Sequence, residues 1–403
     1  MNKVNGLRPD TILTHGGRDP QAFGGVVNVP VVRASTILYP DLQAYESSRV
    51  EKFSSLRYGR YGTQTTFALE EAVAALDGGF RATSFPSGLS AIANVLRALL
   101  RPGDHLLMVD TVYGPARKFC DEALARDGIS TTYYDPAMGA ELVNLITDRT
   151  RVVYCESPGS LTFEVQDIPA ITSVCRPRGI AVVADNTWAT PLFFQAFARG
   201  VDVSIHAATK YIVGHSDAML GIAVTTEEYF ERVRGYAAEH GVIAGPDDCW
   251  LGLRGLRTLG ARLRQHQQSS EIVLDWLLQH PAVSRAYYPA LAGHASHALW
   301  RRDFTGASGL FGLELVPARH DAIHGLINAL KLFGIGSSWG GYESLILPSK
   351  PIRTASQDRT TGPLLRINIG LEDPDDLIAD LEAGLSVFEN QRRDLQRRMN
   401  HAQ

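Results

Sequence analysis

The stretch from Ile180 to Lys210, IAVVADNTWATPLFFQAFARGVDVSIHAATK, contains two short apolar runs, and each leads into a polar residue that can do chemistry. The first run leads to Asp185 and the second to Lys210. Runs of about four to eight residues that are rich in Val and Ile predict buried β-strands. Asp185 brings a carboxylate and Lys210 an amine to the ends of two predicted strands. This placement predicts a ligand site at the edge of the sheet where those strands end.

Similar runs occur on both sides of this stretch, and helix-length segments separate several of them. The runs are RATSFPSG (81–88), HLLMVD (105–110), ISTTYYD (129–135), RVVYCES (151–157) and GIAVTT (221–226). The separating segments include LSAIANVLRALL (89–100) and IPAITSVCRPRG (168–179). Strands joined by crossover helices predict an α/β fold with a mostly parallel sheet and helices on both faces.

At 403 residues the chain is long enough for more than one domain. Residues 1–62 are rich in Gly, Pro and polar residues, and we expect an extended arm that contacts a neighbouring subunit. A helix that begins near residue 64 and stops at Gly78 and Gly79 opens the main domain, residues 63–256. Residues 257–403 combine a long helix, 261–280, with the strand-like runs GLFGLELV and LLRINIG, which predicts a smaller α+β domain.

The composition excludes several classes of protein. A net charge of −4 gives no field that would attract nucleic acid or an anionic membrane. No stretch approaches the roughly 20 apolar residues of a membrane span, and residues 1–10 lack the apolar core of a secretory signal. The irregularly spaced Cys120, Cys155, Cys175 and Cys249 predict buried thiols in a reducing cytoplasm.

Ser87 and Gly88 follow the first of the runs and open a predicted helix. A Ser-Gly pair at that place can leave backbone N–H groups facing one point, where an anion binds, and Gly88 lets the anion come close. The same pair also suits a plain N-capped helix with a tight turn. The chain has no GxGxxG or GxxxxGK[ST] motif, so neither a dinucleotide site nor a P-loop is predicted.

Asp185 and Lys210 each have two interpretations when taken alone. Asp185 can pair with a protonated ring nitrogen, or it can cap the helix that follows. Lys210 is a nucleophile if burial lowers its pKa, or it is a lysine whose long chain reaches out to solvent. His206 and His215 lack a third ligand at a diagnostic spacing, so no metal site is predicted.

The order of these features is more specific than any one of them. An anion-binding turn, a strand-end aspartate and a strand-end lysine would hold the phosphate, the ring nitrogen and the aldehyde carbon of one cofactor. That cofactor is pyridoxal 5′-phosphate (PLP). The sequence therefore predicts a PLP enzyme with its chemistry at Ser87–Gly88, Asp185 and Lys210.

Longer motifs surround these residues over nearly the whole chain. They are THGGRDP (14–20), RYGRYGTQT (57–65), VYGPARKF (112–119), ESPGS (156–160), ADNTWATP (184–191), AATKYIVGHSDAM (207–219), LRGLRTLGARLRQH (253–266), RRDFTGASGLF (301–311), SSWGGYESLILP (337–348) and LLRINIGLED (364–373). This set resembles the Cys/Met-metabolism family of fold-type I PLP enzymes, and within it the bacterial cystathionine β-lyases.

The resemblance implies a role for each matching residue. Lys210 would carry the cofactor aldehyde as a Schiff base, Asp185 would pair with the pyridine nitrogen, and Asn186 would lie near the phenolic oxygen. Tyr113 resembles the tyrosine that stacks on the ring and assists proton transfer. The phosphate ligands would be Ser87, Gly88, Leu89 and Thr209. Tyr58 and Arg60 resemble the pair that a neighbouring subunit contributes to the phosphate site, and Tyr58 would also be catalytic. Ser338 and Arg366 would bind the substrate α-carboxylate. That neighbouring pair implies a homotetramer of two active dimers.

The implied reaction is α,β-elimination, in which L-cystathionine yields homocysteine, pyruvate and ammonia. Trp339 and Tyr342 resemble the β-lyase pattern, whereas γ-acting relatives carry a smaller residue in place of Trp339. A methionine γ-lyase would have Cys where Pro115 stands. A γ-acting relative (a cystathionine γ-synthase, a cystathionine γ-lyase or a methionine γ-lyase) and a non-catalytic PLP-binding regulator remain the alternatives.

Three positions depart from the family pattern. Ala207 replaces a serine that many members use on the phosphate, so one hydroxyl contact is missing. Tyr61 follows Arg60 at a position where some β-lyases have a second arginine. Lys118 stands at a position where the family pattern has an acidic residue that would bind the far end of cystathionine. We expect Tyr61 and Lys118 to change the distal substrate pocket, so that cystine or other S-substituted cysteines could also be substrates.

Overall fold

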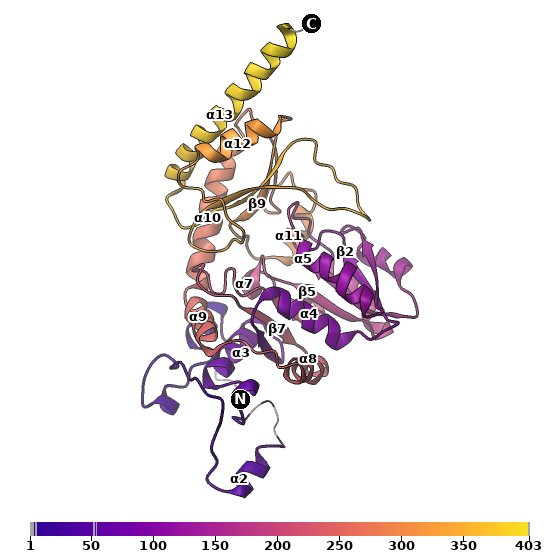
Figure 1. Ribbon diagram of the computed structural model, residues 1–403, viewed down its shortest axis with the longest axis vertical. Coiled ribbons are helices and arrows are strands. Elements are labelled where there is room, and N and C mark those ends of the chain that lie inside the picture. The colour runs from indigo at the N-terminus through magenta and orange to yellow at the C-terminus, as the bar shows by residue number, and fades with distance from the viewer. Residues whose placement is uncertain (1–3, 5, 51–52, 54, 402–403) are drawn as a thin grey trace.

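The computed structural model describes residues 4, 6–50, 53 and 55–401, with side chains up to residue 393. Its centre is a seven-stranded sheet with helices packed around it (Figure 1). The strands are β1 (Arg81–Phe85), β2 (His105–Val109), β3 (Ser130–Tyr134), β4 (Thr150–Glu156), β5 (Ala181–Asp185), β6 (Val203–His206) and β7 (Gly221–Thr225). Their order across the sheet is β1-β7-β6-β5-β4-β2-β3. All seven correspond to the predicted runs.

The sheet is mostly parallel, as predicted. Strands β2 to β6 run parallel to one another, and only β7 is antiparallel, to both β1 and β6. The carboxyl ends of β1, β2, β4, β5 and β6 therefore lie at one edge. Both β2 and β7 are buried at every position, because helices cover the sheet and β-branched residues pack well on it.

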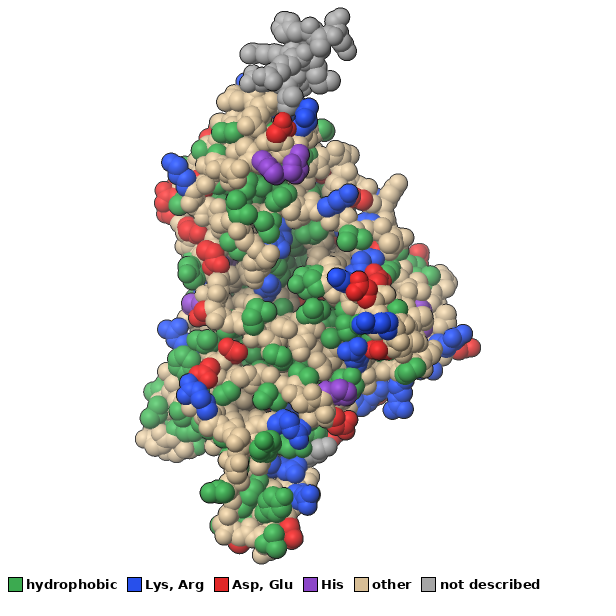
Figure 2. All heavy atoms as spheres, viewed as in Figure 1, with side chains coloured by type: hydrophobic (Ala, Val, Ile, Leu, Met, Phe, Trp, Pro, Cys, Tyr) green, Lys and Arg blue, Asp and Glu red, His purple; other side chains and the backbone are tan. Residues whose placement is uncertain are grey.

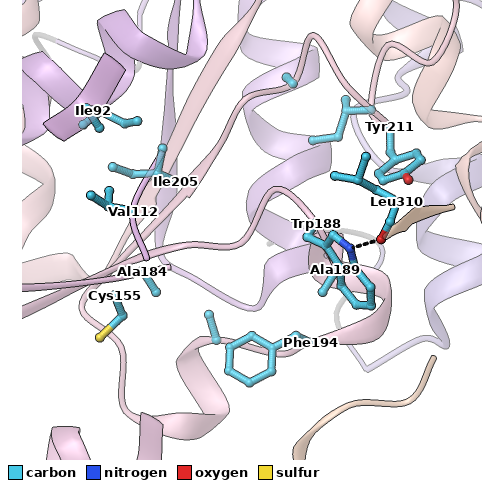
Figure 3. Close-up of a cluster of buried hydrophobic side chains, with 14 of the residues drawn as sticks. Ile92, Val112, Cys155, Ala184, Trp188, Ala189, Phe194, Ile205, Tyr211 and Leu310 are labelled. Atoms are coloured by element: carbon cyan, nitrogen blue, oxygen red, sulfur yellow. Dashed lines mark hydrogen bonds between the residues drawn. The ribbon is translucent and has the colours of Figure 1, made fainter. Parts of the chain in front are cut away.

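Three helices around this sheet correspond to segments predicted from the sequence: α3 (Gln64–Asp77), α4 (Gly88–Leu99) and α6 (Ile168–Cys175). The structure adds α8 (Glu227–Glu239) and α9 (Pro246–Leu256). Helix α3 ends at Gly78, whose φ of +78° is left-handed and suits glycine. One face of α4 is buried on the sheet, and its Ile92 shares an apolar cluster with Ile205 of β6 (Figure 3).

A second, four-stranded antiparallel sheet follows in the order β10-β11-β9-β8. Its strands are β8 (Val283–Tyr287), β9 (Leu310–Leu315), β10 (Leu345–Ser349) and β11 (Leu364–Asn368), and its helices are α10 (Leu259–Leu277), α11 (His297–Asp303), α12 (His320–Ala329) and α13 (Pro374–His401). The sequence predicted β9 and β11 but not the two edge strands. Strand β8 has exposed residues, and β10 contains Pro348, which an edge strand tolerates.

The predicted arm, residues 1–62, is only partly extended. Helix α1 (Pro9–His15) packs into the body, with Ile12 and Leu13 buried, and Arg257 donates hydrogen bonds to the carbonyls of Leu13 and Gly16. Helix α2 (Leu42–Ser47) instead projects away from the rest of the chain (Figure 1). The later part of the arm therefore carries exposed apolar residues, and one of them is Leu38, with 88% of its surface exposed.

The surface in Figure 2 carries basic and acidic side chains interspersed over the same face. This mixture agrees with the small net charge of −4. Within the described ranges, every helix is too short or too polar to cross a membrane.

Several polar contacts join the two sheets and their flanking loops, and two of them lie close to strand ends. Trp188 follows β5 and donates its indole N–H to the carbonyl of Leu310 in β9, at 2.9 Å (Figure 3). Asp110 follows β2, is fully buried, and accepts hydrogen bonds from Thr354 and Ser356 in the loop between β10 and β11. Arg117 also donates to Asp110, at 2.6 Å. These donors hold the pKa of the Asp110 carboxyl well below its usual range.

We predict that Asp110→Ala lowers stability by roughly 3 kcal/mol, because the substitution leaves Arg117 as a buried charge without a partner. The measurement is the midpoint of thermal unfolding. Asp127→Ala is the matched control, since the Asp127–Arg97 pair is partly exposed and worth at most about 1 kcal/mol. Equal shifts in the two variants would contradict the prediction.

Candidate active site

A cavity of about 650 Å³ lies at the carboxyl edge of the large sheet, between that sheet and the second one. Ten of the residues singled out from the sequence line it: Ser87, Gly88, Leu89, Tyr113, Asp185, Thr209, Lys210, Ser338, Trp339 and Arg366. The parallel strands bring the first seven together, because these residues lie at or just beyond the carboxyl ends of strands at one edge of the sheet. Ser338, Trp339 and Arg366 come from the second domain, from strand β11 and the segment before β10.

Lys210 lies in this cavity, just beyond β6. Its Nζ donates a hydrogen bond to Ser338 Oγ at 2.6 Å and lies 5.3 Å from the centre of the Trp339 ring. Burial and, to a smaller extent, the positive charge of Arg366 lower the pKa of Lys210 to about 8, against the opposing effect of Asp185. The amine therefore reaches its neutral, nucleophilic form far more readily than an exposed lysine does.

Asp185 ends β5 and faces the same cavity. One carboxylate oxygen accepts hydrogen bonds from the N–H and the hydroxyl of Thr187, and the other accepts a long one, 3.4 Å, from Tyr154. Burial raises the pKa of Asp185, which these hydrogen bonds only partly offset. A buried carboxylate in this state stabilises a positively charged donor that enters the cavity.

Glu156, at the end of β4, is a cavity residue that the sequence reasoning did not assign, although its motif ESPGS was noted. Its carboxylate accepts hydrogen bonds from the Tyr113 N–H at 2.7 Å and from Ser160 Oγ at 2.6 Å. Burial and the negative charge of Asp185 together raise its pKa to about 8. Glu156 thus fixes the backbone at Tyr113. Its position at a strand end was the signal that could have found it.

Tyr113 precedes helix α5 (Gly114–Lys118) and is partly exposed to the cavity. Burial raises the pKa of its phenol, Glu156 and Asp185 add to the increase, and Arg366 opposes it. The phenol therefore keeps its proton at neutral pH and can donate it.

The N-terminus of α4 forms a cradle beside the lysine. Ser87 caps the helix, and its hydroxyl and carbonyl accept the N–H groups of Ser90 and Ala91. The N–H groups of Gly88 and Leu89 have no acceptor within the helix. A Cβ on Gly88 would lie 2.5 Å from the Cβ of Ala207, so only glycine fits against this loop.

Thr209 and Ala207 offer fewer free hydroxyl groups to the cradle than the family pattern suggests. The Thr209 hydroxyl donates to the Leu220 carbonyl and accepts the Leu220 N–H, at 3.1 and 2.8 Å. Ala207 has no hydroxyl at all. The hydroxyl of Thr187 occupies the space nearby, where it accepts the N–H of Ala207.

Ser338 and Arg366 face Lys210 from the second sheet. Arg366, in β11, donates to the carbonyl of Ser338 at 2.9 Å, and burial lowers its pKa. The backbone of Ser338 has a φ of +85°, a strained conformation for a residue other than glycine. This conformation directs its hydroxyl to the lysine amine, and Trp339 packs against Tyr211 beside it.

Five of the predicted residues lie outside the cavity lining of this chain. The amide of Asn186 is buried and donates to the Phe194 carbonyl. The Lys118 side chain is 71% exposed and lies 3.9 Å from Glu122. Tyr58, Arg60 and Tyr61 lie elsewhere, and Arg60 donates to the Ala238 carbonyl and to the Tyr61 hydroxyl. Neither Asn186 nor Lys118 lines the cavity of this chain.

The two histidines have structural partners. His206 Nε2 lies 2.8 Å from Asp77 Oδ2 and 3.1 Å from Ser204 Oγ, and His215 Nδ1 lies 2.7 Å from the Val213 carbonyl. All four cysteines are free and buried, as predicted.

Comparison with known proteins agrees with this geometry. A model of the family described as Cys/Met metabolism PLP-dependent enzymes matches residues 10–386. The chain belongs to this family. It is 44% identical to the cystathionine beta-lyase MetC of Escherichia coli, over 94% of this chain and 98% of that protein. It is 36% identical to an L-alanine/L-glutamate racemase of Wolbachia pipientis, over 94% and 97%.

A solved structure shows the same fold. The crystal structure of metB from Corynebacterium glutamicum superposes with a TM-score of 0.87 at 29% identity, covering 94% of this chain and 98% of that one. Membership of the family makes PLP the cofactor.

The cavity has the chemistry that PLP requires. Free N–H groups at the start of α4 suit a phosphate, the buried carboxylate of Asp185 suits a ring N–H, and the pKa of Lys210, about 8, suits an amine that must attack an aldehyde. All three lie in one cavity, so one molecule can reach them all.

We predict that the Lys210 amine in cofactor-free protein reaches half-maximal acetylation near pH 8, read by mass spectrometry of peptides. Arg366→Met should raise this midpoint, because it removes a nearby positive charge that lowers the pKa of Lys210. A midpoint near about 10.4, the ordinary lysine value, would contradict the prediction.

Proposed function

We propose that this chain is a PLP-dependent carbon–sulfur β-lyase that converts L-cystathionine into homocysteine, pyruvate and ammonia. The observation that carries the proposal is a lysine with a lowered pKa, Lys210, that lies with Arg366 in a cavity whose residues suit PLP. The name of the E. coli relative supports the reaction and the substrate. Cystine and other S-substituted cysteines are further proposed substrates.

The proposed cofactor contacts follow the geometry of the cavity. The N–H groups of Gly88 and Leu89, with Ser87 and Thr209, bind the phosphate, and Asp185 pairs with the ring nitrogen. Lys210 binds the aldehyde. When bound, the cofactor supplies an electron-accepting ring.

The chain's own residues then position the substrate and move protons. Arg366 binds the α-carboxylate through two N–H groups, a geometry that suits guanidinium. Lys210 Nζ takes the proton from Cα, which a pKa near 8 favours at neutral pH. The bond from Cβ to sulfur breaks, and the Tyr113 hydroxyl, or the protonated Lys210, gives a proton to the leaving thiolate. The remaining three carbons take up water and yield pyruvate and ammonia.

We predict that the purified enzyme releases pyruvate from L-cystathionine, and that Lys210→Ala lowers the rate at least about a thousandfold, because it removes the group that moves the Cα proton. Pyruvate and 2-oxobutyrate are assayed together. 2-Oxobutyrate would indicate a γ-lyase, and cystathionine made from an activated homoserine and cysteine would indicate a synthase.

Two other outcomes would also contradict the β-lyase proposal. A yellow protein that releases no keto acid from any thioether would indicate a non-catalytic PLP-binding regulator. Racemisation of alanine or glutamate without pyruvate release would match the Wolbachia relative instead. Full turnover by Lys210→Ala would remove the lysine from its proposed role.

We also propose that the active unit is a dimer and that two dimers form a homotetramer. Tyr58 and Arg60 lie outside the cavity of their own chain, and exposed apolar residues such as Leu38 surround them on the arm. In this arrangement residues 1–62 are the arm that reaches the partner, residues 63–256 the PLP-binding domain and residues 257–403 the C-terminal domain. Four buried free thiols suit a cytoplasmic location.

We predict that two inactive variants, Arg60→Ala and Lys210→Ala, regain activity when they are unfolded and refolded together. A symmetric dimer with shared sites leaves about a quarter of all sites intact in an equal mixture. The measurement is the pyruvate release rate, compared with each variant refolded alone. If the mixture stays inactive, Arg60 does not act across an interface.

A further inference from the structure

We infer that Lys350 binds the distal carboxylate of the substrate, so that the enzyme selects thioethers whose leaving thiol carries a carboxylate. The inference rests on the proposed β-lyase function and identifies the residue that recognises the leaving half of the substrate. It also assigns to Lys350 the distal role that the sequence had suggested for Lys118.

Five basic side chains line the cavity, and two of them are already neutralised. They are Arg117, Lys210, Lys350, Arg353 and Arg366. Arg117 Nη2 lies 2.6 Å from Asp110 Oδ1, with both side chains buried. Arg353 Nη2 lies 3.7 Å from Glu164 Oε1, and the Arg353 guanidinium also donates to Thr162 and to the Asp110 carbonyl. Neither guanidinium is available for a substrate carboxylate.

The other three basic side chains of the cavity, those of Lys210, Arg366 and Lys350, have different contacts. Lys210 is bound to Ser338 and is needed for proton transfer. Arg366 donates only to backbone carbonyls, those of Ser338 and Gly336. The Lys350 ammonium forms neither a hydrogen bond nor an ion pair with any side chain in the described part of the chain. Apart from Lys210, two cations in the cavity thus lack a carboxylate partner among the described residues, and cystathionine brings two carboxylates.

The two cations lie at different places in the cavity lining. Arg366 is half-buried beside Lys210, whose pKa it lowers, whereas Lys350 is exposed at the rim. In the register of β10 and β11, Arg366 pairs with Leu347, three positions before Lys350. At about 3.3 Å per residue, that separation is about 10 Å along the strand direction. An extended substrate can therefore place one carboxylate at each cation.

The segment that carries Lys350 is held in place over the cavity. Pro351 and Ile352 follow it and also line the cavity, where they offer apolar contacts to the methylene groups of the leaving thiol. Asp110 accepts the N–H groups of Thr354 and Ser356 just beyond. Because Asp110 belongs to the large sheet, this contact fixes the segment relative to Lys210.

The test compares Lys350→Gln with the unmodified holoenzyme on three substrates. L-Cystathionine and S-(2-carboxyethyl)-L-cysteine have a distal carboxylate, and S-ethyl-L-cysteine has none. We expect kcat/KM for the first two to fall about tenfold, through KM, because one charge-assisted contact is lost. The value for S-ethyl-L-cysteine should change less than about twofold, and Lys350→Arg should retain most of the selectivity.

Lys331→Gln is the matched control, since Lys331 is also exposed and lies outside the cavity. It should leave all three substrates unchanged. If Lys350→Gln affects the three substrates equally, or none of them, the inference is overturned while the β-lyase function stands. If the unmodified enzyme releases no pyruvate from any of the three, the proposed function fails and the inference fails with it.

Discussion

The site depends on one constraint, namely that the Lys210 amine lies buried in the same cavity as the Arg366 guanidinium. Burial and the neighbouring positive charge both disfavour the ammonium, and they bring its pKa to about 8. Asp185 limits the shift from the other side, so the amine can exchange a proton near neutral pH. The same guanidinium is free to bind a carboxylate, so substrate binding would partly neutralise the charge that tunes the lysine.

The two-sheet architecture is what brings these groups together. The parallel strands deliver Asp185 and Lys210 from the large sheet, and the antiparallel sheet delivers Ser338 and Arg366. Their relative position therefore depends on contacts between the sheets, such as the buried Asp110 with the loop at 354–356. Asp110 lies outside the chemistry, yet it sets the shape of the cavity on the side where the leaving group would lie.

Much of the fold and several cavity residues were predictable from the local pattern of apolar and polar residues. Apolar runs gave all seven strands of the large sheet, and polar residues at their ends gave Ser87, Asp185 and Lys210. The edge strands β8 and β10 were missed because exposed residues and Pro348 break the alternation that marks a buried strand. The role of Glu156 was missed, because its position at a strand end indicates a site residue but does not indicate the hydrogen bond that it accepts from the Tyr113 N–H.

Family motifs led to ten residues that line the cavity, but not to Lys350. Lys118 lies on α5 with its side chain in solvent, and the unpaired cation at the rim is Lys350, which no spacing rule connects to Lys210. Tertiary packing decides which of several basic residues remains unpaired. The pairing of Arg117 and Arg353 with acidic side chains was therefore visible only in three dimensions.

Reduction of the holoenzyme with borohydride, followed by peptide mass spectrometry, tests the central claim most directly. Reduction converts the Schiff base between the cofactor aldehyde and a lysine amine into a stable C–N single bond. The structure predicts the reduced phosphopyridoxyl mass on the peptide that contains Lys210 and on no other lysine. The same mass on Lys118, Lys331 or Lys350, with Lys210 unmodified, would contradict the account.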